Sequence, residues 1–317
     1  MPALTILGNV AVPYASLILL VGLGAAAAWR RVLDRPRIAI LTEVTASLLL
    51  PVFVFWTAAT GSAASILGQS PWVVVMGLAV GVAGYVIASA WARLAGWDWS
   101  RRSVLQVSGT VGNTGFLGIP ICTALYGSQG AILAVLYDLG ASVFFMTIGL
   151  NAFQVSDSAR GSPARVFLAS LKQLVNPLLL ALVLGLGVAL AGWAVPPILR
   201  QPLEGLSNTV VPLMMLMLGG MIYDVAAQPS SWNGRVLILT LLKLFLLPGL
   251  AWLTVGLLPL PSLVRGVIVI EAAMPSAIFA VVFAERYNAD KSLAASATML
   301  TTLLSMLTVP VFAILVS

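Results

Sequence analysis

The sequence predicts an all-helical, polytopic membrane protein built from two inverted repeats, and three observations lead to this fold class. Of the 317 residues, 60% are hydrophobic and only 8% are charged, whereas a soluble domain carries roughly 25% charged residues. The apolar residues fall into ten stretches of about 20 residues, the length of a membrane-spanning helix. Two of these stretches carry helix breakers at matching positions of the two halves.

Short connections rich in turn residues separate the ten stretches, as at Gly68–Pro71, Gly127–Gly130 and Pro259–Pro261. Glycine, proline and serine in such clusters favour turns. No connection is long enough to hold a soluble domain, so we expect almost the whole chain to lie in the membrane. The expected spans are 11–29, 41–60, 71–92, 103–125, 129–153, 168–191, 204–224, 236–257, 265–284 and 293–316.

The sixteen lysine and arginine residues are distributed unevenly over the connections. Only Arg200 and Arg265 follow even-numbered spans, and Lys243 lies within a span. Because basic residues concentrate on the cytoplasmic side, we expect the odd-numbered connections in the cytoplasm and both termini outside the cell membrane. The other thirteen are Arg30, Arg31, Arg35, Arg37, Arg93, Arg101, Arg102, Arg160, Arg165, Lys172, Arg235, Arg286 and Lys291.

Missing residue types and motifs argue against an enzyme. The chain has no histidine and a single cysteine, Cys122, and it contains neither a Walker A nor a GxSxG pattern. Histidine-ligated metals, Ser-His-Asp triads and internal disulfides therefore have no residues to form them. The net charge of +6 is spread over the ends of apolar spans, so we expect membrane lipid rather than nucleic acid as the surroundings, and no cofactor.

A weak internal repeat relates the two halves. Glu43 and Pro51 in the second span have counterparts in Glu204 and Pro212 of the seventh, both offset by 161 residues. With five spans in each half, the second half must enter the membrane from the opposite side, so the repeat is expected to be inverted. We place the first repeat at 1–160 and the second at 161–317.

Both halves carry an interruption in the middle of an apolar span. The first is the run Gly112–Pro120, which reads Gly-Asn-Thr-Gly-Phe-Leu-Gly-Ile-Pro, and the second is Glu271–Ala277. Backbone polar groups cannot be left unsatisfied in lipid, so a broken span must be buried in protein or line a cavity. Paired interruptions in two halves are the best sequence indication of a transporter binding site.

The run Gly112–Pro120 resembles the fourth span of the auxin efflux carrier family, which typically reads Gly-Asn-Thr-Gly and ends in proline. The resemblance implies that spans 4 and 9 are broken and cross at mid-membrane, between a scaffold of spans 1, 2, 6 and 7 and a transport domain of spans 3–5 and 8–10. The likeness continues at Val211–Leu213, Lys243, Pro248, Ala273–Ala277 and Ala284–Tyr287.

Members of this family are similar to sodium–bile acid symporters, and their substrates include auxin and small dicarboxylates. The short connection between spans 5 and 6 fits a bacterial member, which would reside in the inner membrane. We also expect a homodimer formed through the scaffold domain.

Candidate substrate contacts lie at the first break, in Gly112, Asn113 and Thr114. Asn113 offers two donors and an acceptor, and a half-helix N-terminus favours a carboxylate. Alternatively, Asn113 only caps freed backbone. Pro120 and Pro275 disrupt their helices; either alone would indicate a kink, and the matched pair indicates a crossing.

At the second break, Ser276 completes the expected substrate site and Glu271 is the candidate for ion coupling. A carboxylate inside the bilayer is costly, so Glu271 must be protonated, paired or bound to a cation. The order Glu271-x-x-Met274 is similar to the sodium-binding span of the bile acid symporters, which makes Glu271 a candidate sodium ligand. The alternative is a structural ion pair with Lys243.

Asp138 and Ser142 lie one turn apart on the fifth span, and with Asn113 they could complete a site for substrate or a coupling ion. Asp138 could equally be a hydrogen-bonded core residue or a partner for Lys243. Lys243 could attract an anion, although structural pairing is favoured. The hydroxyl stripe of the tenth span is assigned no function, because such stripes often serve helix packing; it comprises Thr298, Thr301, Thr302, Ser305 and Thr308.

Together these features predict a secondary carrier of a small organic anion, such as a carboxylate or an auxin-like acid. It would work by alternating access, with sodium or a proton as the candidate coupling ion. The alternatives are a channel, whose filter would be formed by the broken helices, and a sensor or receptor that keeps the fold without transport.

Overall fold

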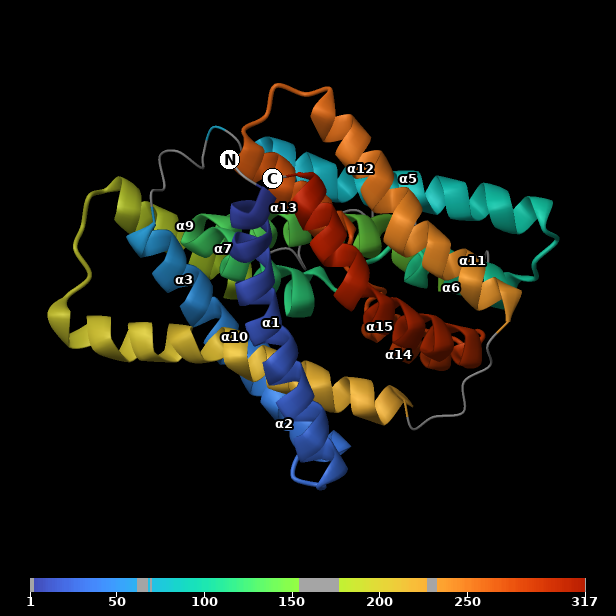
Figure 1. Cartoon of the computed structure of the whole chain (residues 1–317), viewed down its shortest axis with the longest axis horizontal. Coiled ribbons are helices and arrows are strands. Elements are labelled where there is room, and N and C mark those ends of the chain that lie inside the picture. Colours follow the sequence, from blue (N-terminus) through green and yellow to red (C-terminus); the bar gives the residue numbers. More distant parts are fainter. Residues whose placement is uncertain (1–2, 62–67, 69, 154–176, 227–232, 317) are drawn as a thin grey trace. The chain divides into compact units, whose positions relative to one another are not determined.

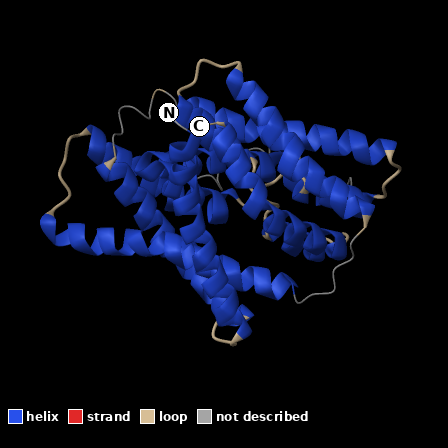
Figure 2. Cartoon of the chain, viewed as in Figure 1, coloured by secondary structure: helices blue, strands red, loops and turns tan. Residues whose placement is uncertain are grey.

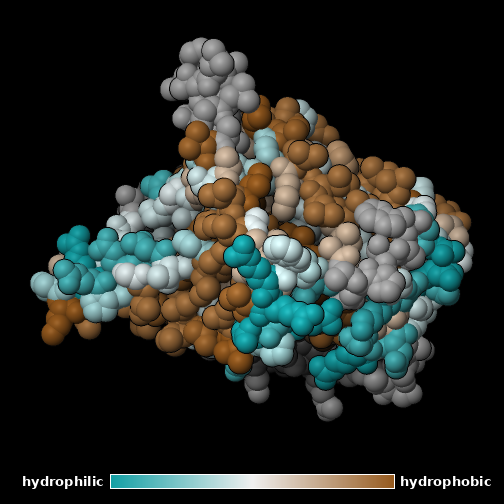
Figure 3. Space-filling view, turned by 60° about the horizontal axis from the view of Figure 1, so that its bottom comes forward, coloured by the Kyte–Doolittle hydropathy of each residue, from teal (hydrophilic) through white to brown (hydrophobic). Residues whose placement is uncertain are grey.

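The structure, a computed structural model, describes residues 3–61, 68, 70–153, 177–226 and 233–316. These residues form helices joined by short turns, and the described part of the chain contains no strand (Figures 1 and 2). The predicted all-helical class is therefore confirmed for the described residues, and their long apolar helices fit a polytopic membrane protein. Large hydrophobic side chains are exposed along most helices, and in Figure 3 brown hydrophobic residues cover broad areas while teal residues form clusters.

The chain divides into two compact units, each assembled from segments far apart in the sequence. Unit 1 comprises 1–71, 115–135 and 175–227, and unit 2 comprises 72–114, 136–174 and 228–317. Within unit 1, α1 packs against α10 and α3 packs against α9. Its helices are α1 (Ala3–Trp29), α2 (Arg35–Val44), the π-helix η1 (Thr45–Leu49), α3 (Leu50–Thr60), α9 (Pro177–Leu190) and α10 (Pro197–Ala226).

In unit 2, α15 packs against α6, α11, α13 and α14. Helix α7 (Ile119–Phe144), preceded by the π-helix η2 (Thr114–Gly118), passes from unit 1 into unit 2. The other helices of unit 2 are α5 (Ser70–Leu94), α6 (Trp99–Ser108), η3 (Phe145–Gly149), η4 (Leu150–Phe153), α11 (Gly234–Leu241), η6 (Leu242–Leu246), α12 (Leu247–Gly256), α13 (Ser262–Ala272), α14 (Phe279–Arg286) and α15 (Lys291–Leu315).

Close packing in unit 1 depends on glycines where α1 meets α10. A Cβ atom built on Gly24 would lie 2.0 Å from the carbonyl oxygen of Leu216, and one on Gly219 would lie 2.0 Å from that of Val21. Glycine therefore lets the two backbones approach more closely than any other residue would allow, as small residues do in membrane helix pairs.

Three of the prolines mark π-helical turns. Each of η1, η2 and η6 is followed by a helix whose second residue is proline: Pro51, Pro120 and Pro248 respectively. Proline has no N–H and its ring collides with the carbonyl of the preceding turn, and a π turn inside a helix widens the ladder at that place. Pro51 and Pro248 thus each follow a π turn, whereas Pro212 and Pro310 lie inside α10 and α15.

The predicted spans correspond to the observed helices with three differences. Among the residues that the structure describes, seven stretches are long and apolar enough to cross a membrane. Span 4 is divided between α6 and the η2–α7 segment, and its second part runs on into span 5 as one 40-residue stretch, Thr114–Phe153, which is interrupted at Gly127, where φ is 63° and ψ is −151°. Span 9 is divided between α13 and α14, which are too short individually. For span 6 only α9 is described, because residues 168–176 lie outside the described part, as do Arg160, Arg165 and Lys172.

Ten spans and the inverted repeat therefore remain predictions, as does the division at residue 160. The counterparts that suggested the repeat differ locally, because Pro51 follows a π turn and Pro212 does not. Two places expected on one side of the membrane do meet: Arg101, in the first turn of α6, pairs with Asp290, which precedes α15, at 3.8 Å.

We predict that Gly24→Ala destabilises unit 1 and that Gly22→Ala does not. The added methyl at Gly24 must displace the Leu216 backbone, and overpacking of this kind costs about 1–3 kcal/mol. The Cβ at Gly22 would meet nothing within 4 Å, so this variant gains only helix propensity. Thermal unfolding in detergent would measure both variants, and equal midpoints would contradict the close contact.

Candidate functional site

The two predicted breaks are present in unit 2, and their unwound segments pair with each other. After α6 ends at Ser108 the chain is extended at Gly112, and after α13 ends at Ala272 it is extended at Ser276. These two residues form an antiparallel β-bridge. Asn113 donates its backbone N–H to the Pro275 carbonyl at 2.8 Å, and Ala277 donates to the Val111 carbonyl at 3.0 Å. Two broken helices thus satisfy part of each other's backbone.

Side chains bind most of the remaining backbone at this bridge. The hydroxyl of Ser276 donates to the Ser108 carbonyl at 2.5 Å, which satisfies an acceptor at the end of α6. The N–H of Ser276 donates to the hydroxyl of Thr301 on α15 at 3.2 Å. All three residues are fully buried. Since a buried unpaired backbone group costs about 1–3 kcal/mol, these bonds hold the second break in its extended form.

A buried charge pair lies beside the bridge. Lys243, in the π turn η6, is 1% exposed and donates its ammonium to the Ala272 carbonyl, which the break frees, at 3.1 Å. It also interacts electrostatically with Glu271, which is fully buried. A Cβ atom on Gly112 would lie 3.3 Å from the Lys243 Nζ atom. Glycine at this position therefore gives the ammonium access to the bridge.

The first break presents a hydrogen-bond donor that has no partner. Asn113 is 7% exposed, and its side-chain Nδ2 is buried without a hydrogen bond to any described residue. The neighbouring Thr114 donates its hydroxyl to the Asp138 carboxylate on α7. Asp138 thereby holds the first residue of η2, and the three side chains form one polar group beside the bridge.

The other predicted site residues are distributed as follows. Met274 is buried in the second break, and its Cβ would lie 3.3 Å from a Cβ on Gly112. Ser142 is partly buried one turn beyond Asp138. Pro120 is the second residue of α7 and belongs to unit 1. All other predicted site residues belong to unit 2.

Two residues at the bridge were not predicted as site residues. Ser108 was not considered because its contribution is a backbone carbonyl, which no sequence motif reveals. Thr301 belongs to the hydroxyl stripe of the tenth span that was assigned to packing. The signal that could have identified Thr301 is its place in this stripe of hydroxyls, of which Thr298, Thr302 and Ser305 are also buried.

The described residues contain no group of three or more cysteine, aspartate or glutamate side chains that could hold a metal ion. A sodium site at Glu271 would need carbonyl oxygens freed by the break, and the Ala272 carbonyl already faces the Lys243 ammonium. The role of Glu271 as a sodium ligand therefore remains a prediction.

Comparison with known proteins shows the family of this chain. Residues 9–313 match the family described as membrane transport protein. The chain belongs to this auxin efflux carrier family. A relative of this family member is an uncharacterized transporter of Methanothermobacter thermautotrophicus, 28% identical over 275 residues, which cover 86% of this chain and 87% of the relative. An uncharacterized transporter of Methanocaldococcus jannaschii is 27% identical over 274 residues, which cover 85% and 87%.

We predict that Thr301→Val destabilises this carrier-family protein by about 1–3 kcal/mol, because it leaves the buried Ser276 N–H without an acceptor. Thr301→Ser should restore most of the stability, since it keeps the hydroxyl. Thr302→Val is the matched control: Thr302 is equally buried on α15 but bonds only to the Thr298 carbonyl of its own helix. Unfolding midpoints of the three variants test the role of Thr301, and equal losses at both threonines would contradict it.

Proposed function

We propose that this membrane transport protein is a secondary carrier of a small organic anion, such as a carboxylate or an auxin-like acid. The observation that carries the proposal is the unbonded Asn113 amide beside the paired breaks. Buried polar groups in native proteins almost always have partners. A buried donor left open at the place where two helices unwind fits a site that a hydrogen-bond acceptor fills.

Positive potential around the bridge favours an anion. The Lys243 ammonium lies beside Gly112, and the helical segments that follow the breaks begin there, at Thr114 and Phe279. Helix N-termini carry partial positive charge, and discontinuous helices of transporters direct such ends at anionic substrate groups. Glu271 offsets part of this charge, so the site suits a weakly bound carboxylate that can also be released.

Alternating access requires two bodies that move against each other. The described helices of predicted spans 1, 2, 6 and 7 fall in unit 1, and those of spans 3, 8, 9 and 10 fall in unit 2 with both unwound segments. This grouping supports our proposal of a scaffold and a transport domain. Under that proposal unit 2 carries the substrate, and the scaffold forms the homodimer.

For the coupling ion we propose a proton in preference to sodium. Glu271 and Lys243 form a buried pair of opposite charges, and protonation of Glu271 would change the charge beside the bridge without any further ligand. Such intramembrane pairs commonly serve as proton relays.

Asn113→Ala should weaken substrate binding about 10- to 100-fold, because a hydrogen bond to a charged group is worth roughly 1.5–3 kcal/mol. The binding constant would be measured by thermal shift with a panel of organic acids, since a ligand of the native state raises its stability. Asn151→Ala is the matched control, because Asn151 is exposed and bonds only to the Thr147 carbonyl of the preceding turn. Equal affinities of the Asn113→Ala variant and the wild type would refute the contact.

Glu271→Gln should abolish the dependence of uptake on pH in proteoliposomes. The variant leaves Lys243 buried without its anionic neighbour, and this loss destabilises the protein by about 3–5 kcal/mol. The double variant Glu271→Gln with Lys243→Met removes both charges and therefore serves as a second test. Wild-type uptake should respond to an imposed pH gradient and not to replacement of sodium by potassium. A sodium requirement that Glu271→Gln removes would instead establish Glu271 as a sodium ligand.

Counterflow in vesicles separates the carrier from the other two functions. A carrier exchanges labelled for unlabelled substrate and saturates with concentration. Unsaturated ohmic current would identify a channel, and substrate binding without flux would identify a sensor or receptor.

A further inference from the structure

Unit 2 carries an apolar groove whose lining residues differ from those that form the bridge, although Leu105 lies on α6, which ends at the first break, and Leu242 adjoins Lys243. The groove has a volume of about 200 Å³ and is formed by α5, α6 and the α11–η6 segment. Its floor is Leu105, which is fully buried, and its rims include Trp91 and Leu246, which are 49% and 43% exposed. The groove is therefore open to the surroundings of the helices, which in this protein are lipid.

The shape and lining of the groove suit a hydrocarbon chain. Ile238, Leu242 and Leu246 line it at helical spacing, and eight residues of helix extend over about 12 Å. Apolar cavities of about 150 Å³ exclude water and accept hydrocarbon ligands. An acyl chain lying along the α11–η6 segment would cover this surface.

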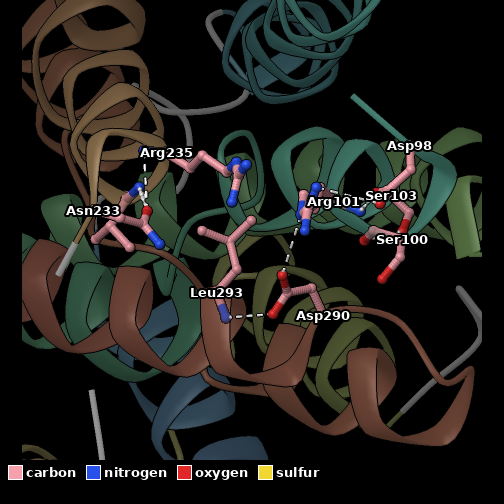
Figure 4. Close-up of polar contacts among 9 residues, drawn as sticks. Asp98, Ser100, Arg101, Ser103, Asn233, Arg235, Asp290 and Leu293 are labelled. Atoms are coloured by element: carbon pink, nitrogen blue, oxygen red, sulfur yellow. Dashed lines mark hydrogen bonds and ion pairs between the residues drawn. The ribbon is translucent and has the colours of Figure 1, made fainter. Parts of the chain in front are cut away.

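Two arginines lie within one helical turn of groove-lining residues and have no acidic partner in the described part of the chain. Arg102 precedes Leu105 by three residues on α6, and Arg235 precedes Ile238 by three residues on α11, so each lies within one helical turn of a residue that lines the groove. Neither guanidinium forms an ion pair with any described residue. Arg101 differs, since it pairs with Asp98 at 3.4 Å and with Asp290 at 3.8 Å (Figure 4).

The surroundings of these arginines match a lipid headgroup region. Both arginines lie in the first turn of a helix, at ends that the distribution of basic residues predicts to be cytoplasmic. Trp91 lines the groove near the end of α5, and tryptophan is typical of the membrane–water interface. Basic pockets between transmembrane helices on this side bind anionic headgroups.

We propose that this groove is a binding site for an anionic phospholipid, with one acyl chain between α5 and the α11–η6 segment and the phosphate at Arg102 and Arg235. The site is separate from the bridge of broken helices and does not depend on the transported substrate. Its occupant is a lipid rather than a soluble phosphate ester, because the apolar groove suits an acyl chain and the two cations within one helical turn of its lining suit a phosphate.

The test uses the purified full-length protein in detergent with added dioleoylphosphatidylglycerol or dioleoylphosphatidylcholine, which have the same acyl chains. The unfolding midpoint should rise more with the anionic lipid, and native mass spectrometry should show at least one anionic lipid retained. Arg102→Gln with Arg235→Gln should reduce the difference between the lipids by at least half. Arg102→Lys with Arg235→Lys should keep it, and Arg30→Gln, on α1–α2, should leave it unchanged.

The acyl-chain part has its own matched pair of variants. Leu246→Trp should fill the groove and reduce lipid retention, whereas Phe245→Trp changes the adjacent residue, which is 49% exposed and does not line the groove. Equal stabilisation of the wild type by the two lipids would overturn the proposal. So would full retention in the double glutamine variant, equal retention in both tryptophan variants, or the same stabilisation by inorganic phosphate.

Discussion

The structure depends on one constraint: backbone polar groups freed inside an apolar helix must find partners within the protein. The two breaks meet this constraint together, because each lends a donor and a carbonyl to the other across the Gly112–Ser276 bridge. Side chains satisfy three further backbone groups near the bridge: Ser276 binds the Ser108 carbonyl, Thr301 binds the Ser276 N–H, and Lys243 binds the Ala272 carbonyl. A broken helix alone would be unstable in lipid, so each break depends on the other for its stability.

This arrangement explains why unit 2 contains so many buried polar side chains. In a soluble protein water could bind the freed backbone groups, whereas in the membrane these side chains supply the hydrogen-bond partners instead. Residues that bond to the backbone at the bridge are structural by this account. Asn113 differs from them, because its amide remains open after the backbone is satisfied, which makes it the residue most suited to a ligand.

The charge pair of Lys243 and Glu271 has a related origin. Burying two opposite charges as a pair costs less free energy than burying either charge alone in a low-dielectric interior. The freed Ala272 carbonyl also accepts a hydrogen bond from the ammonium. Sequence reasoning had considered sodium at Glu271 because of the resemblance to symporters. The alternative considered was an ion pair with Lys243, and the structure places the Lys243 ammonium on the Ala272 carbonyl, a contact between residues 29 positions apart that no sequence pattern indicates.

The sequence alone determined the solvent, the helices and the location of both breaks, since these depend on local hydrophobicity and on proline and glycine chemistry. It also determined the family, because the residues of the breaks are specific to it. Only the tertiary structure decided that the breaks pair, that Thr301 and Ser108 bind them, and which carbonyl receives Lys243. These are contacts between distant segments, and no local preference encodes which distant donor meets which acceptor.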